Sequence, residues 1–147
     1  MKKIIVINGP NLNILGDRES SIYGSISLKT IEELCAQKAK DLKLVCFFCQ
    51  SNNEGELIDF IHLAQNDYDG LIINPAAFTH TSVAIRDALS LFKKPSIELH
   101  ISNIYKREEF RHKSLISDIV NGGIFGLGSE GYILAIISLQ KTLNDED

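Results

Sequence analysis

Two residues able to move a proton lie two positions apart, in a short apolar segment of the sequence. They are Glu98 and His100. If that segment is a β-strand, both side chains leave the same face with their backbones roughly 6–7 Å apart. A carboxylate beside an imidazole fixes the tautomer of the ring and favours a form that can deliver a proton. The same spacing is also typical of a buried structural hydrogen bond, so both interpretations stay open at this point.

A second pair lies in a long polar stretch near the amino terminus, where Arg18 precedes Tyr23. A tyrosine is a poor base because its pKa is ordinarily about 10. An adjacent guanidinium can lower such a pKa by about 1–3 units, which makes the phenol usable as a base. The alternative is an exposed charge beside an aromatic residue that anchors the loop.

Further polar residues fit the binding of a polyhydroxylated anion. His80 and Arg111 offer donors, and Asn11 and Asn74 offer neutral amides. Each has a simpler interpretation as well. His80 could cap a helix that begins near Thr81, and Arg111 could be one charge on a solvated helix.

The elements that must position these residues alternate between strand and helix. Apolar runs rich in β-branched residues and phenylalanine predict buried strands at residues 3–7, 44–49, 70–74, 95–100 and 123–125. This alternation predicts a single α/β domain over residues 1–147, a flavodoxin-like, doubly wound, five-stranded parallel sheet with three α/β/α layers. We expect the acidic tail, residues 144–147, to fray.

Amphipathic periodicity predicts the helices and the faces that they bury. The expected faces are Leu28, Ile31, Cys35, Ala39 and Leu42, then Leu57, Ile61 and Ala64, then Ala84, Ala88 and Leu91. A last helix is expected over residues 129–143. The expected helix starts are Asn53 with Glu56, Thr30 with Glu33, and either Thr81 or Ser82.

Parallel strands bring their carboxyl ends to one rim, where ligands of such sheets bind. That rim comprises residues 8–13, 50–53, 74–80, 98–102 and 126–130, which hold nearly all the unusual polar residues. The connection over residues 8–25 is much longer than the usual βα loop of about 2–6 residues. Such an excess is typical of a lid or binding loop, here residues 16–24.

Composition narrows the classes of ligand. The net charge is −4 and the sequence contains no basic run, which argues against nucleic acid and favours a small molecule. No stretch reaches the roughly 20 apolar residues of a membrane span, and we expect a cytoplasmic protein. The three cysteines fit reduced thiols. Cys46 and Cys49 are expected on opposite faces of one strand, which favours packing over a redox motif.

The glycine motif over residues 126–131 has the form GxGxxG but lacks the strand that a dinucleotide site needs after it. We interpret these glycines as serving tight turning and close helix packing. A flavin protein would need hydroxyl or glycine donors after the first strand, and Pro10 removes one amide there.

Six ordered motifs together resemble one known family. They are NGPNLN (8–13), RE with YG (18–19, 23–24), SN with EGE (51–52, 54–56), THTS (79–82), ELHISN (98–103) and REEFR (107–111). The sequence is similar, over essentially its whole length, to type II 3-dehydroquinate dehydratases. The resemblance implies a cofactor-free, metal-free dehydration of 3-dehydroquinate to 3-dehydroshikimate, by anti elimination in the shikimate pathway. It also implies a homododecamer built as a tetramer of trimers.

The same resemblance implies a role for each matching residue. Tyr23 is the base that removes a proton beside the ketone, and Arg18 keeps it ionised. His100, oriented by Glu98, protonates the departing hydroxyl, and Asn11 holds a water against the enolate oxygen. The remaining implied site residues bind the substrate, and Asp87 does so from a neighbouring subunit: Asn74, His80, Asp87, Arg111 and the backbone amides of Ile101 and Ser102.

Two departures from the usual family pattern bear on the site. Ser20 stands where the lid often has proline, and Ala76 stands where glycine is frequent. The methyl group of Ala76 is expected to affect the loop over residues 74–80. The alternative function is a flavodoxin-like module that binds a small carbohydrate acid without converting it.

Overall fold

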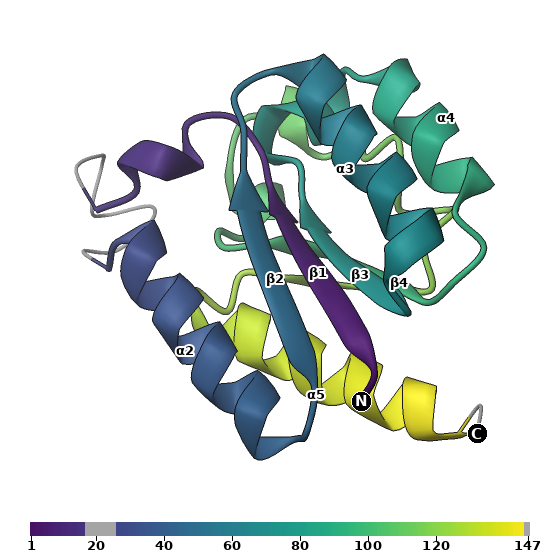
Figure 1. The fold of residues 1–147 in the computed structure, drawn as a ribbon. Coiled ribbons are helices and arrows are strands. Elements are labelled where there is room, and N and C mark those ends of the chain that lie inside the picture. Colours follow the sequence, from purple (N-terminus) through teal and green to yellow (C-terminus); the bar gives the residue numbers. More distant parts are fainter. Residues whose placement is uncertain (17–25, 146–147) are drawn as a thin grey trace.

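The five apolar runs pair into one parallel sheet in the computed structural model of this chain, which describes residues 1–16 and 26–145 (Figure 1). The strand order is β2-β1-β3-β4-β5, which is the order of flavodoxin-like folds. The strands are β1 (Lys3–Asn8), β2 (Val45–Gln50), β3 (Gly70–Asn74), β4 (Ser96–His100) and β5 (Gly122–Phe125). The predicted fold class is confirmed, and each strand lies within one residue of its predicted bounds.

Helices cover both faces of the sheet. Figure 1 shows α2 (Leu28–Asp41) and α5 (Glu130–Asp145) on one face, and α3 (Glu54–Asp67) and α4 (Val83–Leu91) on the other. Residues of β1 alternate between the two cores, with Ile4 and Val6 on the α2/α5 side and Ile5 and Ile7 on the α3/α4 side. Short 3-10 helices complete the rim: η1 (Leu12–Ile14), η2 (Ala76–His80), η3 (Ile104–Lys106) and η4 (Glu109–Arg111).

The central strands and the edge strands differ in burial. β3 and β4 are buried along their whole length, as predicted. The prediction of buried strands is wrong for β2 and β5, where Val45, Phe47 and Phe125 are each exposed by more than two-fifths. Both strands are the edges of the sheet, so each has a neighbouring strand on one side only.

The predicted helix faces hold for α2 and α3 but not for α4. Its buried face consists of Ile85, Ala88 and Leu89, while Leu91 is exposed. The predicted face was Ala84, Ala88 and Leu91, of which only Ala88 is buried. Alanine and leucine occur on both sides of this helix, so the pattern did not identify the buried side. At the other end of the chain, α5 runs to Asp145, and residues 146–147 of the acidic tail lie outside the described residues.

Two of the three predicted helix starts are confirmed. Asn53 caps α3 by accepting a hydrogen bond from the Glu56 N–H, and Ser82 caps α4. The Thr30 prediction is wrong, because Ser27 caps α2 and accepts from the Thr30 N–H over 3.2 Å. Both residues carry a hydroxyl, and the earlier one marks where the backbone becomes helical.

The cysteine and glycine motifs serve the fold as predicted. Cys46 and Cys49 pack against opposite cores, and burial raises the pKa of their thiols to about 11 and about 12. Gly126 and Gly128 have positive φ angles of 82° and 64°, which glycine adopts without strain. A Cβ on Gly131 would meet Leu99 at 3.0 Å, which shows the close packing of helix on sheet. None of the helices described here could cross a membrane.

Candidate active site

A cavity of about 100 Å³ opens where the loops after β1, β3 and β4 meet. It lies at the carboxyl ends of these strands, the edge that the sequence predicted for ligand binding. The structure brings seven of the predicted site residues to its wall: Asn11, Asn74, His80, His100, Ile101, Ser102 and Arg111.

The Glu98–His100 pair has the predicted geometry. His100 Nε2 lies 2.7 Å from Glu98 Oε2, and both side chains are more than nine-tenths buried. Burial disfavours the charged carboxylate, yet hydrogen bonds from His100, Ser117 and Ser114 hold the pKa of Glu98 below its usual value. An ionised carboxylate only accepts hydrogen bonds, so Nε2 of His100 carries the proton. Nδ1 is then the ring nitrogen left to act on a bound molecule.

His80 lies beside His100 in the cavity. The two rings are stacked, with centroids 6.3 Å apart and planes 18° apart. Nδ1 of His80 donates to the Lys113 carbonyl over 2.8 Å, which leaves Nε2 as an acceptor or as the second site of protonation. Burial lowers the pKa of His80, and the neighbouring His100 and Arg111 lower it further. The alternative that His80 caps α4 is wrong, because Ser82 is the cap.

Two guanidinium groups line the cavity. Arg111 Nε donates to Glu108 Oε1 over 3.1 Å, and Arg107 Nε lies 3.8 Å from the same oxygen. Both arginine side chains are less than one-quarter exposed, so Arg111 is not merely a charge on a solvated helix. Two cations facing one carboxylate give this wall a positive charge, which favours an anionic ligand.

Sequence reasoning did not identify Arg107 as a site residue. It is part of the REEFR motif, and its spacing of four from Arg111 was the available signal. That spacing is informative on an α-helix, but this segment consists of separate 3-10 turns, η3 and η4. The His112 ring nitrogen Nε2 lies 3.1 Å from the Arg107 carbonyl and ties this turn together.

A network of buried hydrogen bonds holds the side chain of Asn74 in position. Its Nδ2 donates to the Tyr132 hydroxyl over 3.1 Å, and its Oδ1 accepts from the Ala76 N–H over 3.1 Å. The Tyr132 hydroxyl in turn donates to Asn8 Oδ1 over 2.6 Å. These bonds fix the orientation of the Asn74 amide and tie the ends of β1 and β3 to α5.

The loop after β1 holds Asn11 at the cavity in a left-handed backbone conformation, with φ of 68°. The Asn11 N–H donates to Asn52 Oδ1 over 2.9 Å, so the loop after β2 fixes its position. Gly9 permits this arrangement, because a Cβ there would lie 2.4 Å from the Pro75 carbonyl oxygen. The first and third loops therefore approach each other closely at the cavity.

Four predicted site residues are not among the lining residues, and one of them, Glu98, is bonded to the lining residue His100. Arg18 and Tyr23 lie outside the described residues, as does Ser20. Asp87 is exposed on α4 and does not line this cavity. Across residues 1–16 and 26–145, no group of three His, Cys, Asp or Glu side chains could hold a metal ion.

Comparison with known proteins gives consistent matches. A model of the family described as "Dehydroquinase class II" matches residues 2–140. The 3-dehydroquinate dehydratase of Endomicrobium trichonymphae is 56% identical over 136 residues, which are 92% of this chain and 95% of that protein. The crystal structure of type II dehydroquinase from Butyrivibrio crossotus is 48% identical with a TM-score of 0.92, covering 94% of this chain and 97% of its own. The crystal structure of type II dehydroquinase from Propionibacterium acnes is 43% identical with a TM-score of 0.93, and the match covers 96% of this chain and 97% of that one.

Proposed function

The chain belongs to the class II dehydroquinase family, and from this premise we propose that it is a 3-dehydroquinate dehydratase that forms 3-dehydroshikimate. The observation that carries the proposal is the Glu98–His100 pair at a cavity walled by Arg107 and Arg111. An oriented imidazole can move a proton, and the guanidinium groups can hold an anionic substrate. We place the reaction in the shikimate pathway.

The first step removes a proton from the carbon beside the ketone. We assign this step to Tyr23, with Arg18 stabilising the tyrosinate, because both residues lie in the motifs that carry the resemblance to type II 3-dehydroquinate dehydratases. The electron pair of the C–H bond moves toward the ketone and leaves an enolate oxygen. We assign to Asn11, which lines the cavity, the role of holding a water molecule against that charge.

The second step expels the hydroxyl group at C1. His100 donates a proton to that hydroxyl, which leaves as water as the enolate electrons form the new carbon–carbon double bond. Glu98 stabilises the imidazolium before this transfer and holds Nε2, which leaves Nδ1 as the ring nitrogen that transfers the proton. The overall change is an anti elimination of one water molecule.

Substrate binding follows from the charge and donors of the wall. Arg111 and the backbone amides of Ile101 and Ser102 bind the carboxylate and hydroxyl groups. Asn74 and His80 supply further polar contacts, with His80 Nε2 available because its Nδ1 is bound to a carbonyl.

We also propose the homododecamer, a tetramer of trimers in which Asp87 approaches the site of a neighbouring subunit. Asp87 lies on α4, where Val83 and Leu91 expose 60% and 66% of their surface. Val83, Asp87 and Leu91 are spaced four apart on the helix, so two exposed apolar side chains flank the charge along one side and favour a contact surface there. Light scattering tests this: a fully active monomer would contradict the assembly.

Turnover by the purified chain tests the function. The protein is incubated with 3-dehydroquinate, and the enone absorbance of 3-dehydroshikimate is followed. Catalytic growth of this absorbance supports a dehydratase. Tight binding without any growth would favour the alternative, a module that binds a small carbohydrate acid. Tyr23→Phe is expected to abolish turnover, and an active variant would refute the assignment of the base.

A further inference from the structure

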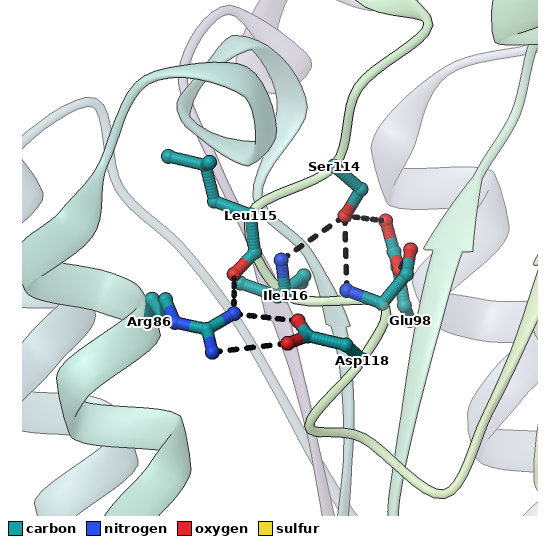
Figure 2. A network of polar contacts seen from close by, with 7 residues as sticks. Arg86, Glu98, Ser114, Leu115, Ile116 and Asp118 are labelled. Atoms are coloured by element: carbon teal, nitrogen blue, oxygen red, sulfur yellow. Dashed lines mark hydrogen bonds and ion pairs between the residues drawn. The ribbon is translucent and has the colours of Figure 1, made fainter.

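Two serine hydroxyls hold the carboxylate that orients His100. Ser114 Oγ donates to Glu98 Oε2 over 2.9 Å, and Ser117 Oγ donates to Glu98 Oε1. The Ser114 contact is visible in Figure 2. His100 shares Oε2 with Ser114, so both carboxylate oxygens have donors. The carboxylate therefore cannot rotate about its last bond without breaking a hydrogen bond.

The serines belong to a turn that closes on itself. Ser114 Oγ accepts hydrogen bonds from the N–H groups of Ile116 and Ser117, each over 3.1 Å. The same hydroxyl thus shapes the turn and donates to Glu98. Because Ser117 is exposed while Glu98 is buried, this turn brings donors from the surface to a buried charge.

Helix α4 anchors this turn from the opposite side. Arg86 Nη1 donates to the Leu115 carbonyl over 2.8 Å, and the guanidinium pairs with both carboxylate oxygens of Asp118 at 2.5 and 3.0 Å (Figure 2). A bidentate pair of this kind fixes direction as well as distance. Arg86 therefore holds the turn at two points, one on either side of Ile116.

The segment also contacts the second histidine of the cavity. The Lys113 carbonyl accepts from His80 Nδ1, and the Leu115 N–H donates to the Thr79 carbonyl over 2.9 Å. Residues 113–118 thus contact both His80 and Glu98 without lining the cavity themselves.

We propose that Ser114 and Ser117 are positioning residues for the dehydration, which orient His100 through Glu98, and that Arg86 and Asp118 hold them in place. The proposal rests on the proposed function. Groups that support a catalytic residue from behind commonly change activity about 10–100-fold when removed, as measured for the partners of metal-binding histidines. The competing interpretation is structural: the hydroxyls only satisfy a buried carboxylate and do not affect the ring.

The first experiment compares steady-state kinetics on the full chain. The double variant Ser114→Ala/Ser117→Ala is expected to lose about 10-fold or more in kcat, with KM changed less than about 3-fold. Ser117→Thr keeps a hydroxyl and is expected to retain most of the kcat that Ser117→Ala loses. Ser138→Ala, an exposed serine on α5, is the matched control and should leave kcat unchanged.

The second experiment reads the ring directly and needs no turnover. Nitrogen-15 NMR of histidine-labelled protein should show His100 as the Nε2–H tautomer in its neutral form, as the bond to Glu98 requires. In the double variant the Nδ1–H tautomer should gain population. Because this signal is independent of substrate, a chain without dehydratase activity would still reveal whether the serines orient the ring.

Asp118→Asn is the substitute if the double variant does not fold. The Asp118 side chain is 64% exposed, so we expect this variant to fold. This variant weakens the Arg86–Asp118 pair and leaves both serines present. We therefore expect a smaller fall in kcat than in the double variant, and a change in the His100 tautomer in the same direction. Wild-type kcat and an unchanged tautomer in the double variant, or in Asp118→Asn if only that variant folds, would overturn the proposal. So would an equal loss of kcat in Ser117→Thr and Ser117→Ala.

Discussion

The Tyr132 hydroxyl donates a hydrogen bond to Asn8 Oδ1 over 2.6 Å, although 124 positions separate the two residues in the sequence. Both side chains are fully buried, and burial raises the pKa of the phenol well above its usual range, so Tyr132 stays neutral. The same hydroxyl accepts from Asn74. One phenol therefore satisfies two buried amides directly beneath the cavity.

Tyr132→Phe is expected to lower the free energy of unfolding by roughly 2–4 kcal/mol, because Asn8 and Asn74 each lose a buried hydrogen-bond partner. Urea denaturation measures the loss. Tyr105→Phe is the control: Tyr105 is 54% exposed and should change stability by less than about 0.5 kcal/mol. Equal effects of the two variants would show that the buried network does not stabilise the chain.

Ala76→Gly is expected to raise the free energy of unfolding by about 0.5–1 kcal/mol. Ala76 has a φ of 53°, a left-handed conformation that costs an alanine roughly 1–2 kcal/mol. The flexibility of glycine in the unfolded chain offsets part of this gain. Thermal or urea denaturation measures the change.

The neighbouring Ala77→Gly is the control for this effect. Ala77 does not have a positive φ, so its replacement should lower stability by about 0.5–1 kcal/mol. Destabilisation of similar size at both positions would mean that the Ala76 backbone is not strained.

The stability contributed by Glu98 should depend on pH. The folded state holds the pKa of Glu98 below its ordinary value of 4.5, so the unfolded chain binds this proton more tightly. The contribution is therefore complete above pH 4.5 and is lost as the pH falls through the lower folded pKa. Urea denaturation of wild type and Glu98→Gln at pH 7 and pH 3.5 measures it. The advantage of wild type should shrink at pH 3.5, and an equal advantage at both pH values would contradict the ionised carboxylate.

Local sequence patterns sufficed for part of the site. Glu98 and His100 share one strand, where the period of two fixes which side chains are neighbours. The alternation of strands and helices likewise placed the carboxyl ends of β1, β3 and β4 at one edge. These predictions succeeded because each depends on residues close together in the chain or on a general rule of parallel sheets.

The remaining features depend on contacts between distant segments. No periodicity connects Tyr132 with Asn8, and none connects Ser117 with Glu98, because a loop and a helix end are positioned by tertiary packing. The exposure of β2 and β5 depends on which strands form the edges of the sheet. The sequence of a single strand does not determine its place in the strand order. Arg107 was overlooked because two 3-10 turns, rather than a helix, carry it to the cavity.

The most direct test of the central claim is the rate at which His100→Ala forms the product enone from 3-dehydroquinate, with substrate binding measured in parallel by calorimetry. His62→Ala, an exposed histidine on α3, is the matched control. Loss of general acid catalysis is expected to lower kcat by about 100-fold or more while the variant still binds substrate and the control stays fully active. A His100→Ala variant that turns over at the wild-type rate would contradict the account.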